Sequence, residues 1–349
     1  MDTEPALPLA VSYSVSVPDI SSPNHVLVRV RAVGLNPTDY KMLKGFNTPG
    51  LGAGCDFCGT VELAGAHAAM PAGTRICGAV FPYHAGNAAN GAFSQWLVAD
   101  SRLLLKVPDS WTDEQAAGLG AVGWSTASLC LSDPQALALQ GLPSKPAEKH
   151  TPVVVYGGAT ATGLMAIQLL KRSGYAPIAV CSPASSPLVI DCGAVATVAY
   201  TSPDCVETVK SIAAGAPIRQ ALDCITQAES ASVCFGAIAR TGGRYACLEE
   251  FHDSWRTRRA VKVKVVMGFE IEGVTVDLEH QVYTRKARPE LLDLGVVWAR
   301  EMQGLLDAGA IKTQPIREVQ GGLEGVIKGL SALQRGEARG HKLVARVFE

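Results

Sequence analysis

Residues 153–163, VVVYGGATATG, decide the fold, because an apolar run typical of a buried strand leads through a glycine-rich turn directly into a helix. This arrangement lets backbone N–H groups and the helix N-terminus face a pyrophosphate, as they do in dinucleotide-binding domains. The match to the dinucleotide fingerprint is imperfect, because Thr160 and Thr162 stand where a glycine and a small apolar residue are expected. We expect a dinucleotide site here; an ordinary strand-to-helix turn without a ligand is the alternative.

The same stretch and the composition argue against several other functions. Gly158 and Gly163 have the glycine spacing of a P-loop, but Leu164 and Met165 follow where lysine and serine or threonine are required for nucleoside triphosphate hydrolysis. The 31 lysines and arginines nearly balance 32 acidic residues, so no global basic field favours nucleic acid or an anionic membrane. The longest uncharged stretch, residues 115–132, is interrupted by glycines, and we expect a buried helix there rather than a membrane span.

Beyond this stretch strands and helices alternate, which is typical of parallel strands joined by right-handed crossovers. The expected strands are 152–156, 177–181, 196–200, 220–225 and 244–248, and the helices among them are 160–173, 204–214 and 229–239. Together they predict an α/β fold with a doubly wound parallel sheet of the Rossmann type.

The first part of the chain follows a different pattern. Residues 1–115 contain short alternating segments such as HVLVRVRAV (25–33), separated by glycine-rich turns, and these predict a barrel-like β domain. An alanine-rich helical stretch then begins, with Thr112 or Asp113 as its N-cap, and continues to about residue 131.

The last part of the chain returns to the first pattern. A long helix over about 288–308 is followed by the strand-like PIREV, a helix over 322–335 and a terminal strand, HKLVARV. We therefore expect a discontinuous first domain, residues 1–125 and 273–349, around a Rossmann domain of residues 126–272.

The end of the second strand of the Rossmann pattern predicts which dinucleotide is bound. Sites for NAD usually carry an acidic residue there, which binds the ribose 2′-hydroxyl and repels a 2′-phosphate. This chain instead has Ser182 and Ser185, with no acidic residue before Asp191, and this favours NADPH. The alternative is a hydroxyl-rich turn that caps its own backbone, and residues 176–200 contain no lysine or arginine that would decide between them.

The ten cysteines lie mostly inside apolar runs, and the acidic, proline-containing start of the chain lacks the pattern of a signal peptide. We therefore expect most cysteines to be reduced and buried, and the protein to be cytoplasmic.

Several segments of the chain resemble those of a known family. The segments NPTDYKMLKG (36–45), GCDFCGTV (54–61), GAFSQW (91–96), AAGLGAVGWSTA (116–127), VVVYGGATATG and GHKLVARV (340–347) resemble medium-chain dehydrogenase/reductases of the zinc-independent quinone-oxidoreductase type. A closer resemblance, to the trans-acting enoyl reductases of fungal polyketide synthases, is carried by YGGATAT, GYAPIAVCSP (174–183), ALDCIT (221–226) and VQGG (319–322).

This resemblance implies a fold and an activity. The discontinuous domain would be GroES-like, and the enzyme a monomeric oxidoreductase that uses NADPH to reduce the α,β-double bond of a polyketide thioester in secondary metabolism. The thioester would be held transiently by the acyl carrier protein of a highly reducing polyketide synthase or a polyketide synthase–peptide synthetase hybrid, without nucleic acid or membrane.

The resemblance also implies a set of cofactor-binding residues at matching positions. They are Thr38, Asp39, Tyr40, Lys41, Ala159, Thr160, Ala161, Thr162, Ser182, Pro183, Ala184, Ser185, Tyr200, Leu248, Glu249, Leu343 and Val344. Two of these residues have a purely structural alternative: Tyr200 could be an aromatic residue at the end of a strand, and Lys41 a solvated residue of a helix.

Substrate-binding and catalytic residues are implied in the same way. The substrate would lie along a helix and along a strand around residue 267, at Thr126, Ala127, Ser128, Leu129, Cys130, Leu131, Ser132, Asp133, Met267, Gly268, Phe269, Glu270 and Ile271. Lys41 and Thr126 would lie near the nicotinamide ribose. The proton donor is left open among Tyr40, Lys41, Thr126 and solvent.

No metal is expected. Zinc-dependent relatives have a cysteine after the first strand, a Gly-His-Glu motif and a cysteine quartet, whereas this chain has NPTD and GCDF at the first two places and no cysteine in residues 86–100. Cys55 and Cys58 form one pair without a second pair or a neighbouring histidine, so two buried strand cysteines are expected rather than zinc ligands or a redox dithiol.

Two other functions are kept as alternatives. A stand-alone NADPH-dependent quinone or enone reductase would use the same fold and cofactor, and a non-enzymatic nucleotide-binding or structural role is the second. A carrier protein would dock on a local basic patch, for which Arg256, Arg258 and Arg259 are the candidates; a solvated loop is the alternative there.

Overall fold

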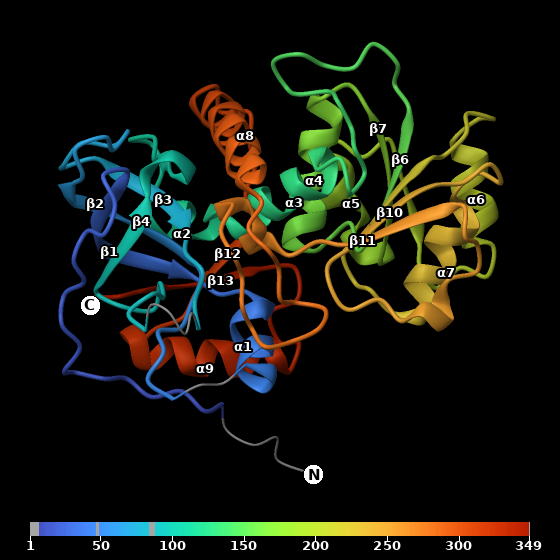
Figure 1. Cartoon of the computed structure of the whole chain (residues 1–349). Helices are drawn as coiled ribbons and strands as arrows, with labels where there is room; N and C mark the ends of the chain where they lie inside the picture. The colour runs from blue at the N-terminus through green and yellow to red at the C-terminus, as the bar shows by residue number, and fades with distance from the viewer. Residues whose placement is uncertain (1–6, 47–48, 84–87, 349) are drawn as a thin grey trace, which may run out of the picture. The chain divides into compact units, whose positions relative to one another are not determined.

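The computed structural model describes residues 7–46, 49–83 and 88–348, which form two compact units (Figure 1). Unit 1 comprises Met1–Val122 and Met302–Glu349, and unit 2 comprises Gly123–Glu301. The chain therefore returns to unit 1 at its C-terminal end. Residues 273–301, which we expected in the first domain, pack within unit 2; the predicted domain boundaries stay a prediction. The first six residues, on which part of the signal-peptide argument rests, lie outside the described residues.

Unit 2, all of whose residues are described, contains a parallel six-stranded sheet in the order β11-β10-β9-β6-β7-β8. Its strands are β6 (Pro152–Tyr156), β7 (Ala176–Cys181), β8 (Ala196–Ala199), β9 (Gln220–Asp223), β10 (Gly243–Cys247) and β11 (Val261–Val265). All residues of β6 are buried, which explains its uninterrupted apolar sequence. The doubly wound sheet predicted from the alternating pattern is confirmed.

Helices α4 (Ala161–Arg172), α5 (Ser186–Asp191), α6 (Cys205–Ile212) and α7 (Ala228–Ala237), with the 3₁₀ turns η2 (Pro183–Ser185) and η3 (Asp253–Trp255), lie between successive strands of this sheet. Helix α3 (Val122–Ser132) precedes the sheet in the chain, and the 3₁₀ turn η4 (Gly268–Glu272) and α8 (Pro289–Asp307) follow it. The amphipathic α4 begins after Thr160 and ends before Gly174, as its sequence predicted.

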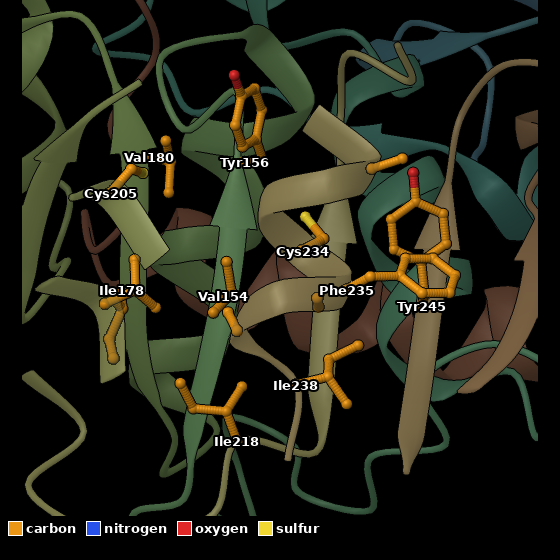
Figure 2. Close-up of a cluster of buried hydrophobic side chains, with 14 of the residues drawn as sticks. Val154, Tyr156, Ile178, Val180, Cys205, Ile218, Cys234, Phe235, Ile238 and Tyr245 are labelled. Atoms are coloured by element: carbon orange, nitrogen blue, oxygen red, sulfur yellow. The ribbon is translucent and has the colours of Figure 1, made fainter. Parts of the chain in front are cut away.

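One face of the sheet packs against α6 and α7 to form a core (Figure 2). Val154 and Tyr156, two positions apart on β6, both contribute to it, because alternate side chains of a strand point to the same face. Phe235 of α7 and Tyr245 of β10 pack with ring centroids 5.3 Å apart. This core holds the carboxyl ends of the central strands at fixed positions.

The described part of unit 1 contains a seven-stranded sheet built around β1 (His25–Gly34), in the order β12-β13-β1-β2-β3-β5 with β4 also paired to β1. The other strands are β2 (Asp56–Ala64), β3 (Arg75–Ala79), β4 (Trp96–Asp100), β5 (Leu105–Lys106), β12 (Ile316–Glu318) and β13 (Lys342–Arg346). Two register shifts between β1 and β2 bend the sheet, which suits a barrel-like domain. Helices α1 (Pro37–Gly45), α2 (Asp113–Leu119) and α9 (Gly322–Gln334) and the 3₁₀ turn η1 (Ser101–Leu103) complete this unit.

Three expectations about individual elements are wrong. The helical stretch from Thr112 to about residue 131 is broken into α2 and α3 at Gly120, whose φ of +49° does not fit a right-handed helix. A strand was expected around residues 267–271, but Gly268–Glu272 form the 3₁₀ turn η4, because the Glu270 carboxylate accepts a hydrogen bond from the backbone N–H of Met267 and closes the turn. Strand β11 was missed, since its lysines interrupt the apolar pattern.

None of the helices in the described ranges is both long enough and apolar enough to cross a membrane.

Candidate active site

The direction of strand order in unit 2 reverses between β6 and β9, since β7 and β8 follow on one side and β10 and β11 on the other. In open α/β sheets ligands bind in the crevice outside the carboxyl ends of the strands at this reversal. Tyr156 ends β6 and Asp223 ends β9, and the two residues pair directly across the sheet. The fold therefore places its candidate ligand site at the glycine-rich turn after Tyr156.

The glycines of this turn are required by close packing. Gly157 has a φ of +75°, and a Cβ at this position would lie 2.9 Å from Ile225. A Cβ at Gly163 would lie 2.3 Å from the carbonyl oxygen of Gly157, so α4 can begin this close to the strand only with glycine there. The N-terminus of α4 consequently lies beside the strand end, as in a dinucleotide cradle.

Thr160 replaces a fingerprint glycine without disrupting this geometry. It is the N-cap of α4, and its Oγ1 accepts a hydrogen bond from the N–H of Gly163 at 3.0 Å and donates one to the carbonyl of Gly157 at 2.9 Å. The amides of Ala161 and Thr162 belong to the first turn of α4, so they have no acceptor within the helix and are available to an anion. The residues present therefore fit a dinucleotide phosphate.

The other cofactor-binding residues predicted in unit 2 lie at the ends of neighbouring strands. Ser182 and Ser185 follow β7, and their hydroxyls lie 2.8 Å apart; Ser182 also caps η2 by accepting from the Ser185 N–H. The two serines therefore do cap their own turn, as the alternative interpretation expected. Both are only half-buried, in the same turn as Pro183 and Ala184. Tyr200 follows β8 and is 51% exposed, so it is not a core aromatic. Leu248 and Glu249 follow β10 and are half-buried.

Thr126 lies on α3 and is almost covered by η4. The side chain of Thr126 is buried, and a Cβ added at Gly268 would lie 2.6 Å from its Oγ1. The substrate segment predicted from the sequence is therefore brought directly onto the predicted catalytic hydroxyl. Along α3, the side chains of Ala127, Ser128, Leu129, Cys130 and Leu131 are buried in the packing of this helix.

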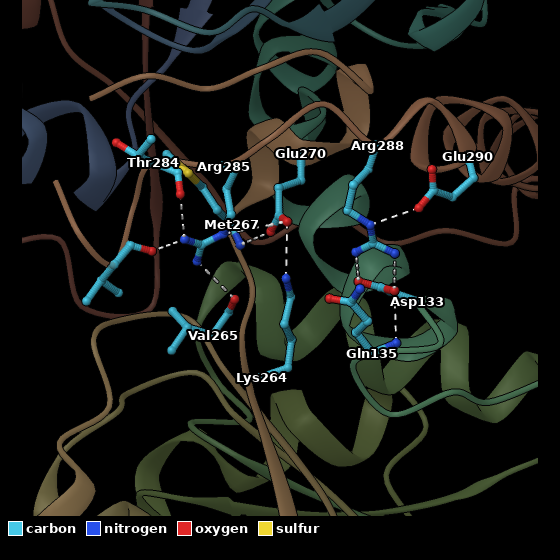
Figure 3. A network of polar contacts seen from close by, with 11 residues as sticks. Asp133, Gln135, Lys264, Val265, Met267, Glu270, Thr284, Arg285, Arg288 and Glu290 are labelled. Atoms are coloured by element: carbon cyan, nitrogen blue, oxygen red, sulfur yellow. Dashed lines mark hydrogen bonds and ion pairs between the residues drawn. The ribbon is translucent and has the colours of Figure 1, made fainter. Parts of the chain in front are cut away.

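Two ion-pair networks fix η4 and the segment after it (Figure 3). Glu270 is buried and pairs with Lys264 at 3.1 Å and Arg285 at 3.6 Å. Asp133, at the end of α3, accepts two hydrogen bonds from Arg288, at 2.9 and 3.0 Å.

Contacts within the fold already use the polar groups of three predicted substrate residues. Hydrogen bonds and the charge of Arg288 hold the pKa of Asp133 below its usual range despite the cost of burial. Ser132 likewise accepts from the indole N–H of Trp298 at 3.0 Å. Asp133, Ser132 and Glu270 are therefore engaged structurally, and their predicted contact with a substrate stays a prediction.

In unit 1 the four predicted cofactor residues of α1 differ in exposure. Lys41 is exposed and Thr38 and Tyr40 are half-buried, whereas Asp39 is fully buried. Asp39 Oδ2 accepts the backbone N–H of Asn36 at 2.7 Å and so closes the helix start, while Oδ1 has no hydrogen-bond partner. Burial, and the charge of Asp56, raise the pKa of Asp39 to about 7.

The sequence reasoning missed a buried polar cluster next to Asp39. Asp56 Oδ2 accepts from Lys342 Nζ at 2.9 Å and from Asn36 Nδ2 at 2.8 Å, and Lys342 also donates to Asn36 at 2.6 Å. Asp56 Oδ1 accepts the backbone N–H groups of Ala121 and Val122. The Asn-Pro turn and the acid in GCDF were visible in the sequence, but the lysine lies almost 300 residues away along the chain.

Leu343 and Val344 follow this lysine on β13. Both side chains are buried, and their backbone carbonyls accept from Leu35 and Val319. Their proposed approach to the nicotinamide stays a prediction.

No group of three or more histidine, cysteine, aspartate or glutamate side chains is arranged to hold a metal within the described residues. All ten cysteines are described and are free thiols, nine of them buried. Burial raises the pKa of Cys77 and of Cys224 to about 12 and moves the pKa of Cys55 and Cys58 in the same direction. Thiols of this kind behave as small apolar side chains rather than as nucleophiles.

Comparison with known proteins identifies relatives along nearly the whole chain. Residues 22–109 match the family described as Alcohol dehydrogenase GroES-like domain. Trans-enoyl reductase sthE of Phaeosphaeria nodorum is 58% identical over 98% of this chain and 94% of that protein. Trans-enoyl reductase calK of Penicillium decumbens is 53% identical, with the same coverage of both chains.

A solved structure described as a putative zinc-dependent alcohol dehydrogenase protein from Rhizobium etli matches with a TM-score of 0.73 at 20% identity, over 93% of this chain and 90% of that one. At this identity the likeness establishes the fold alone.

We predict that Asp39 makes the stability of the protein depend on pH. Because its folded-state pKa of about 7 exceeds the ordinary value of 3.8, the folded protein binds an extra proton between these values. The resulting stability is complete below about pH 4 and is lost as pH rises through about 7. Asp39→Asn should therefore gain roughly 2 kcal/mol relative to the natural protein between about pH 5 and pH 8, measured by urea unfolding.

Asp109→Asn is the matched control, since Asp109 is exposed. Its urea unfolding over the same pH range controls for the removal of one acidic side chain. A pH-independent difference for Asp39→Asn would show that the carboxyl is ionised throughout this range.

Proposed function

The chain belongs to the trans-enoyl reductases, a branch of the medium-chain dehydrogenase/reductase superfamily, and it is an oxidoreductase; we propose that it reduces the α,β-double bond of a polyketide thioester held by an acyl carrier protein, with NADPH as reductant. The observation that carries this proposal is 58% identity to a trans-enoyl reductase over nearly the full length of both chains. The carrier would belong to a highly reducing polyketide synthase or a synthase–peptide synthetase hybrid. We further propose a cytoplasmic monomer.

Two observations support NADPH. The glycine-rich turn and the start of α4 form a cradle that fits a pyrophosphate, and the turn after β7 carries Ser182 and Ser185 instead of an acidic residue. A neutral turn removes the repulsion that an acidic residue would exert on a 2′-phosphate. When bound, the cofactor supplies the two electrons of the reduction as a hydride.

The chain's own residues have to orient the substrate and stabilise charge on the thioester oxygen, since no metal is proposed to do so. The Thr126 hydroxyl is the proposed donor in unit 2, because it is buried and the substrate segment starts against it at Gly268. In unit 1, Lys41 and Tyr40 on α1 are the proposed partners. The proton that completes the reduction comes from Tyr40, Lys41, Thr126 or solvent.

The fold uses one of the three arginines of the basic patch that we expected for carrier docking. The Arg258 guanidinium donates to the carbonyls of Phe235, Ile238 and Ala239 and so caps the C-terminal end of α7. Arg256 forms an ion pair with Asp253 at 3.7 Å. Because Arg258 caps α7, we propose only Arg256 and Arg259 for carrier docking.

The proposed reaction is tested by comparing the same enoyl chain on pantetheine and on a carrier protein. We expect NADPH oxidation with both thioesters and a specificity constant at least about tenfold higher for the carrier-bound chain, because carrier contacts add binding energy. Faster reduction of small quinones than of either thioester would instead identify a stand-alone quinone reductase. Absence of NADPH binding would favour the non-enzymatic alternative.

We predict a preference for NADPH over NADH of at least about tenfold in dissociation constant, equivalent to about 1.4 kcal/mol. The physical reason is the neutral turn at Ser182 and Ser185. Ser182→Asp should reverse the preference, and titration of both cofactors measures it. Ala184→Ser, which adds a hydroxyl to the same turn without charge, is the control. Equal affinity of the natural protein for both cofactors would remove the argument.

We predict that Thr126→Val and Lys41→Ala each lower turnover on the order of 100-fold while the fold is retained, because each removes a donor that positions the reacting groups. Thr208→Val, an exposed threonine on α6, is the control for the first change. Steady-state kinetics with an enoyl thioester, together with circular dichroism, measures both effects. Unchanged turnover would make Lys41 a solvated helix residue and Thr126 a packing residue.

A further inference from the structure

Thr226, directly after β9, has an unusual backbone conformation. Its φ of +60° lies in the left-handed region, and among the described residues it is the only β-branched residue there. Such a conformation is strained for a branched side chain and persists only where the surroundings enforce it. Strain of this kind concentrates where a precise local geometry is needed.

Asp223 holds it. This carboxylate is fully buried and accepts four hydrogen bonds: two on Oδ1 from the N–H groups of Ile225 and Thr226, both at 2.9 Å, and two on Oδ2 from the hydroxyls of Ser230 and Tyr245, at 2.6 and 2.7 Å. The donors come from the loop, from α7 and from β10. Thr226 is therefore fixed by three elements that are themselves packed into the core.

The side chain of Thr226 in turn binds the backbone of the residues that follow β10. Its Oγ1 accepts hydrogen bonds from the backbone N–H of Leu248 at 3.1 Å and of Glu249 at 3.3 Å. The strand ends at Cys247, so these are the first two residues beyond it. Thr226 itself is almost fully buried.

The same corner also touches the glycine-rich turn. A Cβ at Gly157 would lie 2.9 Å from Cγ1 of Ile225 and 3.2 Å from Cβ of Cys224. The ends of β6, β9 and β10 thus meet at one place, which is the edge where the proposed cofactor lies. Thr226 is joined to this edge by the backbone of residues 224–226 and by the side chains of Cys224 and Ile225.

We propose that Thr226 is a positioning residue for the cofactor, whose hydroxyl fixes the backbone of Leu248 and Glu249 in the conformation that binds NADPH. This inference rests on the proposed function, in which Leu248 and Glu249 contact the cofactor. In this conformation the Thr226 Oγ1 accepts from both amides while the Thr226 N–H donates to Asp223.

Three substitutions separate the hydroxyl from the strain. Thr226→Ser keeps the hydroxyl and removes the branch, Thr226→Val keeps the branch and removes the hydroxyl, and Thr226→Gly removes both while tolerating the positive φ. We expect the dissociation constant of NADPH, measured by fluorescence titration, to stay near the natural value in the serine variant. In the valine and glycine variants it should rise about tenfold, because two amides lose their acceptor.

Hydrogen exchange provides a second readout without cofactor. The amides of Leu248 and Glu249 should exchange faster in the valine and glycine variants than in the natural protein, and at the natural rate in the serine variant. Ser230→Ala is the matched control: it removes one donor to Asp223 and should lower the melting temperature, while leaving the exchange of these amides and the affinity for NADPH unchanged.

The outcomes distinguish this inference from the proposed function. If the natural protein binds NADPH and all three Thr226 variants bind it equally well, Thr226 only stabilises the fold and the inference is overturned. Loss of affinity in the serine variant as well would also overturn it, because the hydroxyl would not be the cause. If the natural protein does not bind NADPH, the proposed cofactor fails and the inference fails with it.

Discussion

The buried carboxylate of Asp56 joins four segments of unit 1 that are distant in sequence. It accepts hydrogen bonds from Asn36 after β1, from Lys342 at the start of β13 and from the two amides that begin α3, while it belongs itself to β2. A buried charge is tolerated only when its lone pairs are used and an opposite charge is close, and Asp56 meets both conditions. The C-terminal segment, which returns to unit 1 and pairs with β1, supplies the cation of this contact through Lys342.

The break between α2 and α3 follows from the same carboxylate. At Gly120 a Cβ would lie 2.1 Å from Cγ of Asp56, so the carboxylate can reach the start of α3 only where the chain has no side chain. Helix propensity favours a continuous helix through this alanine-rich stretch. The buried carboxylate of Asp56 requires hydrogen-bond donors, however, and the backbone N–H groups of Ala121 and Val122 provide them. Tertiary electrostatics therefore decides where one helix ends and the next begins.

The difference between local and long-range interactions explains which features the sequence could predict. Strand β6, the turn at Gly157 and Gly158, and helix α4 are contiguous, so propensity, periodicity and capping by Thr160 agree and the prediction is confirmed. The Asp56 and Asp223 clusters each combine residues from three or more segments, and a single sequence carries no signal for such partners. The 3₁₀ turn η4 is a short apolar run whose conformation is decided by the carboxylate of Glu270, so periodicity could not distinguish it from a strand.

The buried acids also limit what chemistry the chain can supply. Asp56, Asp133, Asp223 and Glu270 are all engaged by cations or by hydroxyl and amide donors. Among the described residues, Asp39 is the only buried acid with an oxygen that has no hydrogen-bond partner. The groups proposed to act on the substrate are the hydroxyls of Thr126 and Tyr40 and the ammonium group of Lys41. Donors of this kind stabilise developing negative charge, as reduction of an unsaturated thioester requires.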